Sequence, residues 1–247
     1  GMAIHNTAAR TAHALFFIAL RPAKMPPENS TVTSSFPFPE APARAKSEAD
    51  IAAARKKLRN AGIAAREALP EALRRALTAR IETHLDALLG HLAPARIAFC
   101  WPWRGEVDLV PWAHRWLATD PARRAALPIV RKPGQAMEFL RWQPGAAMET
   151  DHHGIPVPTG AEALEPDLIL VPLNVFDAAG FRLGYGGGYF DRTLAALDPA
   201  PLTVGVAFEL ARADTTWPQP HDHPMRWIVT EAGAQQASEA AGMFSGD

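Results

Sequence analysis

The feature that most constrains the fold is a strand, a glycine-rich loop and a helix start that follow one another along the chain. "DLILVPL" (residues 167–173) is a nearly continuous apolar run, which is typical of a strand buried on both faces. "YFDRTLAAL" places Phe190, Leu194 and Leu197 on one helical face. Between them, residues 184–188 include four glycines in five positions. The order predicts a strand–loop–helix junction with a bare backbone.

Such a junction is a candidate binding site for an anion. Free backbone N–H groups and the positive end of a helix dipole converge there, and glycines let an anion approach closely. Arg182 adds a planar fork suited to phosphate, and Asp191 has a carboxylate able to hold Mg²⁺ on that phosphate. The glycines fit neither G-x-x-x-x-G-K-[ST] nor G-x-G-x-x-G. The alternative is a glycine-rich turn that packs a helix tightly on a sheet.

The rest of the chain alternates between helix and strand patterns. Ser47 and Asp50 form an acidic variant of the capping box before a long helix. Pro70 fits the first turn of a second helix, which Gly90 is expected to end. Five further runs predict strands: "RIAFCW", "LPIVRK", "MEFLRW", "LTVGVAF" and "RWIVT". Strands separated by helices imply an α/β fold, with a mostly parallel sheet covered on both faces.

Composition and charge limit the classes of partner. The formal net charge of −1 gives no overall field that would attract nucleic acid or an anionic membrane. Cys100 is the only cysteine, which excludes an internal disulfide and fits a reducing, cytoplasmic location. We interpret residues 1–45 as a linker-like N-terminal extension, with Met25 as a candidate start, and residues 46–247 as a single domain.

The glycine-loop region resembles the signature of the 5-formyltetrahydrofolate cyclo-ligases, also called methenyltetrahydrofolate synthetases. "DLILVPLNVFDAAGFRLGYGGGYFDRTL" meets every fixed position of D-hydrophobic-P-x-x-x-F-D-x-x-G-x-R-L-G-x-G-x-G-[YF]-[YF]-D-x-x-L. Four other segments resemble the family in the same order: "EVDL", "LPIVRKPGQAMEF", "GIPVP" and "HDHPMRWIVTE". The resemblance covers about Ala52 to Glu231.

The resemblance implies a three-layer αβα fold of the type shared with ribose-5-phosphate isomerases and CoA transferases. It also implies an ATP-dependent enzyme that closes 5-formyltetrahydrofolate to 5,10-methenyltetrahydrofolate. ADP and phosphate are released, and the formyl oxygen is phosphorylated on the way. The expected ligands are ATP, Mg²⁺ and the folate, and the expected state is a monomer or a weak homodimer. Neither nucleic acid nor a membrane is an expected partner.

On the nucleotide side, the resemblance implies residues from two parts of the chain. Arg182 and Asp191 are the expected catalytic residues, and Asp191 is also the expected metal ligand. Arg55 and Arg59 match the two cations of K-x-x-x-R and share a helix face, because they are four positions apart. The alternative for these two arginines is a solvated basic face. The other expected ATP-binding residues are Gly184, Gly186, Gly187, Gly188 and Tyr189.

On the folate side, the resemblance implies three residues. Glu106 offers a carboxylate that accepts paired N–H groups of a pterin ring, and a helix-start carboxylate is the alternative. Met137 matches a methionine that lines the folate pocket, with core packing as the alternative. Tyr189 and Phe190 match an aromatic pair, of which one ring is expected to contact ligand and the other to pack under the helix.

Departures from the family pattern lie mainly in the expected folate walls. Val157 stands where many relatives carry Glu, and Val130 and His153 fall where some relatives place aromatic side chains. The alternatives are an enzyme of this fold acting on a different formyl or amide substrate, and a non-catalytic folate- or nucleotide-binding paralogue. The intact glycine loop argues against the second. His221 and Asp222, in "HDH", are expected to fix a loop rather than to bind zinc.

Overall fold

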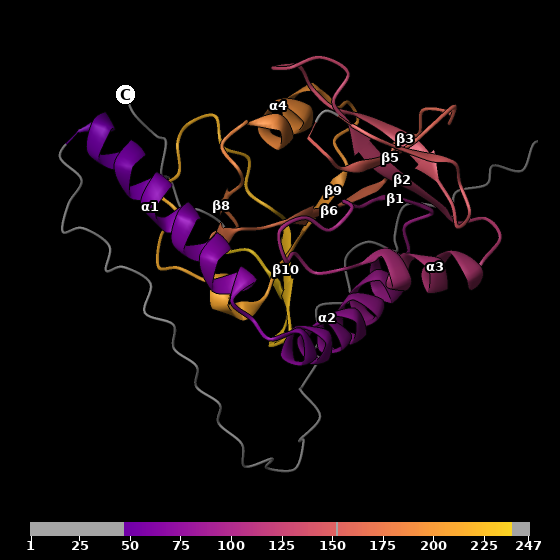
Figure 1. Ribbon diagram of the computed structural model, residues 1–247, viewed down its shortest axis with the longest axis horizontal. Coiled ribbons are helices and arrows are strands. Elements are labelled where there is room, and N and C mark those ends of the chain that lie inside the picture. The colour runs from indigo at the N-terminus through magenta and orange to yellow at the C-terminus, as the bar shows by residue number, and fades with distance from the viewer. Residues whose placement is uncertain (1–46, 152, 239–247) are drawn as a thin grey trace, which may run out of the picture. The chain divides into compact units, whose positions relative to one another are not determined.

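The computed structural model describes residues 47–151 and 153–238 (Figure 1). The interpretation of residues 1–45 as an extension, and of Met25 as a candidate start, therefore lies outside the described residues. All the described residues belong to one compact unit.

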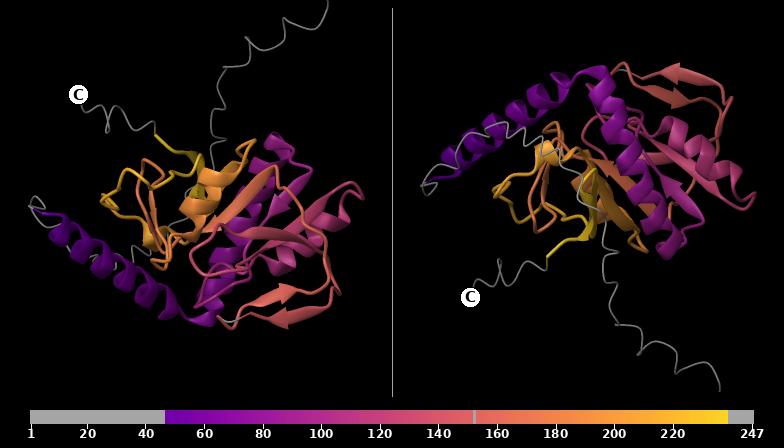
Figure 2. Two further views of the ribbon diagram at one scale, coloured as in Figure 1. Left: turned by 90° about the horizontal axis from the view of Figure 1, so that it is seen from above. Right: turned by 90° about the horizontal axis from the view of Figure 1, so that it is seen from below.

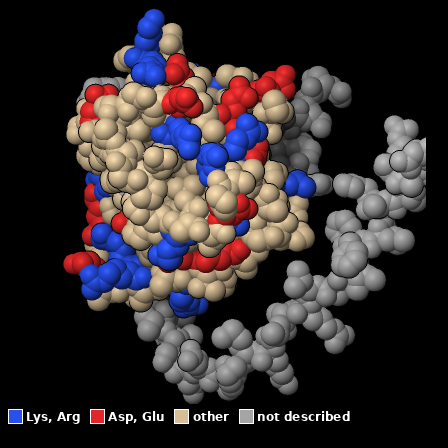
Figure 3. All heavy atoms as spheres, turned by 90° about the vertical axis from the view of Figure 1, so that its right-hand side faces the viewer, with Lys and Arg blue, Asp and Glu red and all other residues tan. Residues whose placement is uncertain are grey.

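Two features of the described residues bear on possible partners. No helix among them is both long and apolar enough to cross a lipid bilayer. On the face shown in Figure 3, Lys and Arg side chains are interspersed with Asp and Glu side chains. That face therefore presents charges of both signs.

A seven-stranded sheet forms the core of the unit, in the order β11-β10-β9-β6-β1-β2-β3. Its strands are β1 (Arg96–Ala98), β2 (Arg124–Ile129), β3 (Glu138–Trp142), β6 (Leu168–Pro172), β9 (Leu202–Val206), β10 (Trp227–Thr230) and β11 (Gly233–Gln236). The four pairs from β10 to β2 are parallel, whereas the edge strands β11 and β3 run antiparallel to their neighbours. The prediction of a mostly parallel sheet is confirmed, and all six predicted strands lie in it.

Helices cover both faces of this sheet, so the unit has three layers (Figure 1, Figure 2). These helices are α2 (Glu71–Leu92), α3 (Val110–Ala118) and α4 (Tyr189–Ala196). On one face, Ile81 and Leu85 of α2 and Trp112 of α3 are completely or almost completely buried against the strands. On the other face, Phe190 and Leu194 of α4 pack on a second apolar cluster. The predicted apolar face of α4 is thus confirmed.

The first helix, α1 (Glu48–Glu67), contacts β7 (Val175–Phe176) and the short helix η1 (Glu209–Ala211). Its predicted cap is confirmed, because Ser47 Oγ accepts from the Asp50 backbone N–H over 3.2 Å. Gly62 lets α1 approach closely, since a Cβ there would lie 2.3 Å from the Asn174 carbonyl oxygen. Asn174 follows the end of β6, so this contact holds α1 against the carboxyl edge of the sheet.

Both predicted boundaries of α2 need correction. Gly90 does not end the helix, which continues to Leu92. Ala93 ends it in a left-handed conformation with φ 48°, and the residue before a proline is disfavoured in the helical region. Pro70 is the N-cap rather than a residue of the first turn.

Two small strand pairs were not predicted. They are β4 (Met148–Thr150) with β5 (Pro156–Pro158), and β7 with β8 (Arg182–Leu183). The sequence suggested that the glycine loop follows the buried strand β6 directly. The pair β7–β8 stands between them, so it does not. The short hairpin instead carries Arg182 to the start of the loop.

Candidate active site

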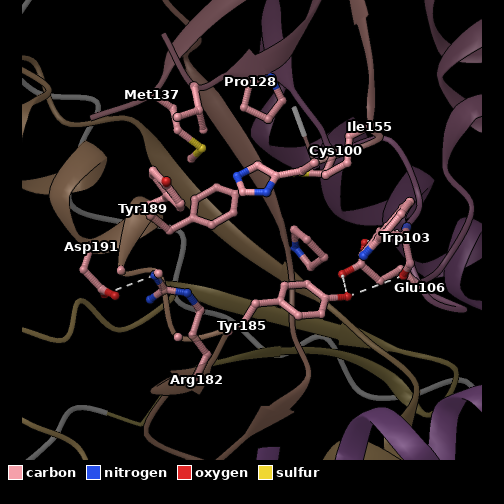
Figure 4. A pocket seen from close by; sticks show the side chains of 18 of the residues that line it. Cys100, Trp103, Glu106, Pro128, Met137, Ile155, Arg182, Tyr185, Tyr189 and Asp191 are labelled. Atoms are coloured by element: carbon pink, nitrogen blue, oxygen red, sulfur yellow. Dashed lines mark hydrogen bonds and ion pairs between the residues drawn. The ribbon is translucent and has the colours of Figure 1, made fainter. Parts of the chain in front are cut away.

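A pocket of about 590 Å³ opens at the carboxyl edge of the parallel sheet (Figure 4). Trp101, Val130 and Pro172, at or just beyond the ends of β1, β2 and β6, contribute to its wall. This is the edge at which open α/β sheets bind ligands. The pocket also brings together every site residue predicted from the sequence: Arg55, Arg59, Glu106, Met137, Arg182, Gly184, Gly186, Gly187, Gly188, Tyr189, Phe190 and Asp191.

The glycine loop (residues 184–188) joins β8 to α4 with a bare backbone. Within the described residues, the backbone N–H groups of residues 186–189 have no hydrogen-bond acceptor. Gly186 and Gly188 have φ angles of 96° and 64°, which side chains other than glycine rarely adopt. Unpartnered N–H groups at a helix start form a site suited to an anion.

Arg182 and Asp191 form an ion pair beside this loop. Arg182 Nη2 donates to Asp191 Oδ1 over 3.0 Å, and Arg182 Nη1 donates to the His223 carbonyl over 2.7 Å. The His223 backbone N–H donates to Asp191 Oδ1 over 3.0 Å. The Arg182 side chain is only 4% exposed. Burial lowers the pKa of Arg182, and the charge of Asp191 opposes that shift.

Asp191 fits the role of a single protein ligand for Mg²⁺. Its Oδ1 is occupied by Arg182 and His223, whereas no donor among the described residues contacts Oδ2. Magnesium bound with nucleotides usually takes one or two protein carboxylates, phosphate oxygens and water. In the described residues, no three His, Cys, Asp or Glu side chains come together as a metal cluster. The donor set therefore suits a metal that arrives with phosphate.

Arg59 of α1 lies against the glycine loop. Its Nε donates to the Gly184 carbonyl over 2.6 Å, and its guanidinium lies next to Gly186. Its Nη groups have no acceptor among the described residues. Burial, and then the charge of Arg55, lower the pKa of Arg59. Arg59 therefore presents unused donors where the loop presents unused N–H groups.

Arg55 lines the same pocket, where its guanidinium is paired with the carboxylate of Asp222. Its Nη1 donates to Asp222 Oδ2 over 2.6 Å and its Nη2 to Asp222 Oδ1 over 3.2 Å. Nη1 also donates to the Trp217 carbonyl over 2.7 Å. These contacts tie α1 to the segment around Asp222, in agreement with the expectation that "HDH" fixes a loop.

Glu106 lies on the other side of the pocket, in the segment between β1 and α3 (Figure 4). Its Oε2 accepts from the Trp103 backbone N–H over 3.0 Å, and its Oε1 accepts from the Tyr185 hydroxyl over 2.9 Å. Burial raises the pKa of Glu106, while Arg66 and these hydrogen bonds oppose the rise. Glu106 does not begin a helix, because α3 starts at Val110.

Met137 and the two aromatic residues of α4 all line the pocket. Met137 and Tyr189 both line the pocket (Figure 4), and the Tyr189 ring centroid lies 6.4 Å from that of His153. Phe190 reaches the pocket but also packs on the apolar cluster under α4. The guanidinium carbon of Arg182 lies 5.7 Å from the centroid of the Phe190 ring.

Three residues at or beside the pocket were not predicted from the sequence: Arg66, Tyr185 and Trp103. Arg66 is buried, and its Nη1 donates to Asn174 Oδ1 over 2.8 Å while its Nη2 donates to the Tyr185 hydroxyl over 2.9 Å. Its helical spacing was an available signal, because Arg66 follows Arg59 by two turns of the same helix. Tyr185 lies inside the glycine loop. Nothing in the sequence marked Trp103.

The fold and the pocket define a class of α/β protein in which a glycine loop and an Arg–Asp pair face a separate buried carboxylate across one cavity. A model described as the 5-formyltetrahydrofolate cyclo-ligase family matches residues 52–231, most of the chain. The chain belongs to this family. The matched range agrees with the extent of the resemblance in the sequence.

Three comparisons place the chain among its relatives. It is 31% identical over 116 residues to a 5-formyltetrahydrofolate cyclo-ligase of Mycolicibacterium smegmatis, covering 43% of this chain and 59% of that protein. It is 32% identical over 93 residues to the one of Haemophilus influenzae, covering 35% of this chain and 50% of that protein. The matched stretches thus span half to three fifths of these relatives. An NMR structure of Aquifex aeolicus 5,10-methenyltetrahydrofolate synthetase has a TM-score of 0.65 and 29% identity, covering 74% of this chain and 92% of that one.

Proposed function

We propose that this protein catalyses the ATP-dependent cyclisation of 5-formyltetrahydrofolate to 5,10-methenyltetrahydrofolate, with release of ADP and phosphate. One observation carries the proposal: a single pocket holds the glycine loop with Arg182 and Asp191 at one side and the buried carboxylate of Glu106 at the other. The first set suits phosphate, and the carboxylate suits the N–H groups of a pterin ring. Family membership and the names of the relatives support the same reaction.

The reaction needs activation because the oxygen of a formamide is a poor leaving group. Transfer of the γ-phosphoryl group of ATP to the formyl oxygen releases ADP and gives an imidate-like phosphate ester. The substrate nitrogen N10 then attacks the formyl carbon, and its proton passes to solvent. The carbon–oxygen bond breaks as phosphate leaves, so the formyl oxygen departs in the phosphate.

The residues at the glycine loop bind the phosphate groups of ATP and offset their negative charge during phosphoryl transfer. The N–H groups of residues 186–189 donate to phosphate oxygens, and Arg182 and Arg59 offset the negative charge. When bound, Mg²⁺ supplies further charge neutralisation, with Asp191 as its protein ligand. Positioning and electrostatic stabilisation are most of what an enzyme contributes to phosphoryl transfer.

The folate side of the pocket combines one carboxylate with a varied wall. Ionised Glu106 accepts the paired N–H groups of the pterin, and Met137 lines the pocket on the side of Tyr189 (Figure 4). Val130 and His153 also line the pocket, whereas Val157 is buried in an apolar cluster. The wall formed by Val130 and His153 is the observation that favours the second candidate, an enzyme of this fold acting on another formyl or amide substrate.

The proposal includes Mg²⁺ as the metal, a cytoplasmic location and a monomer or weak homodimer. A non-catalytic folate- or nucleotide-binding paralogue is the alternative from another functional class. The unpartnered N–H groups beside an Arg–Asp pair argue against it, because such groups also stabilise the charge that develops during phosphoryl transfer.

The absorbance of the methenyl product tests the proposal. The protein is mixed with 5-formyltetrahydrofolate and Mg-ATP, and the methenyl band is followed with time. The band should grow only when the protein, the folate and ATP are all present. A flat trace, with both ligands shown by calorimetry to bind, would identify a non-catalytic paralogue. A flat trace without folate binding, followed by ADP release with another formyl compound, would identify the second candidate.

A further inference from the structure

We propose that Tyr185 is a positioning residue that couples the nucleotide side of the pocket to the folate side. This inference rests on the proposed function, because it takes the glycine loop as the phosphate site and Glu106 as the pterin acceptor. Its basis is a single side chain that starts in the glycine loop and ends at the carboxylate.

The contacts of Tyr185 span the pocket (Figure 4). Its backbone lies between Gly184 and Gly186, and its hydroxyl donates to Glu106 Oε1 over 2.9 Å. The same hydroxyl accepts from Arg66 Nη2 over 2.9 Å. Arg66 and Glu106 themselves are 3.9 Å apart, so the hydroxyl completes the link between the two charged groups.

The hydroxyl is also one of only a few described contacts that hold the glycine loop. The Tyr185 residue is 46% exposed, so its ring is not fixed by burial in the core. The other polar contacts to the loop among the described residues come from Arg59, which donates to the Gly184 carbonyl, and from Arg192. The Arg192 side chain donates to the Gly187 carbonyl over 2.6 Å, and its backbone N–H donates to the Gly188 carbonyl over 3.1 Å. Glycines on both sides of Tyr185 leave the backbone free to change conformation.

Two ligands that act on one such element must influence each other. A phosphate group bound to residues 186–189 restrains the loop and keeps the Tyr185 hydroxyl on Glu106. A pterin bound to Glu106 favours the same arrangement, because the carboxylate is then ionised and held by its donors. Coupling of this kind is reciprocal: each ligand must tighten the binding of the other by the same factor.

Tyr185→Phe is the direct test, because it removes the hydroxyl and keeps the ring. Calorimetry measures the Kd of 5-formyltetrahydrofolate with and without a saturating non-hydrolysable Mg-ATP analogue. In the unsubstituted protein the analogue should tighten folate binding by about fivefold or more, within the usual range of coupling between sites. In Tyr185→Phe the ratio of the two Kd values should fall to near one, while each ligand still binds and the melting temperature is maintained.

Met137→Leu is the matched control, because it alters the folate wall without touching the hydroxyl link and conserves side-chain volume. It should keep the coupling ratio even if the folate Kd itself changes. Tyr185→Leu is a second variant that should also lose the ratio. If Tyr185 has only a structural role, Tyr185→Phe and Tyr185→Leu should have a lower melting temperature. The ratio of the two folate Kd values should then be the same as in the unsubstituted protein.

The outcomes for this inference and for the proposed function are distinguishable. If the protein forms the methenyl product but Tyr185→Phe keeps the full coupling ratio, the coupling role is wrong and the proposed function stands. An active protein in which the two ligands bind independently also overturns the coupling role. If the unsubstituted protein binds both ligands and forms no product, the proposed function fails, and the ratio still decides whether Tyr185 couples the two subsites.

Discussion

Arg182 and Asp191 are held by the two backbone groups of one residue, His223. The His223 carbonyl accepts from Arg182 Nη1 over 2.7 Å, and the His223 N–H donates to Asp191 Oδ1 over 3.0 Å. The direct bond from Arg182 Nη2 to Asp191 Oδ1 closes the triangle. One oxygen of Asp191 therefore has a structural role, and the other is available to a ligand.

Replacing Asp191 with Asn separates these two roles. The amide oxygen can still accept from Arg182 and His223, but the charge that would hold Mg²⁺ is lost. We expect turnover to fall by on the order of a hundredfold, as when an electrostatic partner of the transition state is removed, with little change in folate Kd. Asp167→Asn, which also takes a carboxylate from an arginine pair, is the control and should keep its turnover. Near-normal turnover of Asp191→Asn would remove Asp191 from the metal site.

Gly187→Ala tests whether the loop has glycine at this position so that phosphate can reach its backbone N–H groups. Gly187 does not have a left-handed φ, and a Cβ there would lie 2.8 Å from the Tyr189 ring, a side chain that can shift. We therefore expect a nearly unchanged ligand-free melting temperature and a lost rise on adding Mg-ATP. Thermal melts with and without Mg-ATP measure both. A lowered ligand-free midpoint with the ATP-induced rise preserved would make the loop a structural turn.

Two helical glycines should respond to alanine with opposite signs. At Gly62 a Cβ would lie 2.3 Å from a backbone oxygen of Asn174, so Gly62→Ala should lower the free energy of unfolding by about 1–3 kcal/mol through overpacking. At Gly90 the space around a Cβ is open, and Gly90→Ala should raise it by about 0.5–1 kcal/mol. Denaturant unfolding of both variants checks the pair. Equal effects would mean that α1 does not approach Asn174 closely.

The raised pKa of Glu106 predicts how the stability of the protein depends on pH. Because burial raises that pKa above its ordinary value of 4.5, the folded protein binds the Glu106 proton more tightly than the unfolded chain. The stability of the protein relative to Glu106→Gln should therefore decrease as pH rises from 4.5 through the raised pKa. Melting temperatures of both proteins across this range check the sign. A difference that grows in favour of Glu106 on raising the pH would mean that Arg66 and the hydrogen bonds outweigh burial.

The same shift bears on folate binding. Only the ionised carboxylate accepts both N–H groups of a pterin, so the folate Kd should rise on acidification at a higher pH than an ordinary glutamate would give. Glu106→Gln should bind folate weakly, without that pH dependence. A folate Kd with identical pH profiles in the two proteins would place the pterin elsewhere.

Much of the fold was readable because buried strands are apolar runs and helices have their own period. The six strands found this way pair side by side, and the glycine loop singled out by the strand–loop–helix order lines the pocket. The strand that was not predicted, β11, has the sequence Gly-Ala-Gln-Gln and lies at a sheet edge with alternate residues exposed, so it has no continuous apolar run. Gly90 was misread because a glycine at the end of an apolar pattern is a common stop signal, whereas the left-handed Ala93 is the actual stop.

The parts of the site that escaped prediction depend on contacts between distant segments. Arg55 reaches Asp222, 167 positions along the chain, so its spacing on α1 could not show that its guanidinium is already engaged. Tyr185 reaches Glu106 across 79 positions. The spacing of apolar residues shows which helix or strand carries a residue, and a sequence motif indicates which residues line a pocket. Which of them bond to one another follows only from the packing of the distant segments that carry them.

The fate of the formyl oxygen tests the proposed chemistry most directly. 5-Formyltetrahydrofolate carrying a heavy oxygen isotope in its formyl group is converted with Mg-ATP, and the released phosphate is analysed by mass spectrometry. Phosphorylation of the formyl oxygen predicts one heavy oxygen in each phosphate and one phosphate for each methenyl product. Product formed with unlabelled phosphate, and the heavy oxygen recovered in water, would contradict activation of the formyl oxygen by ATP.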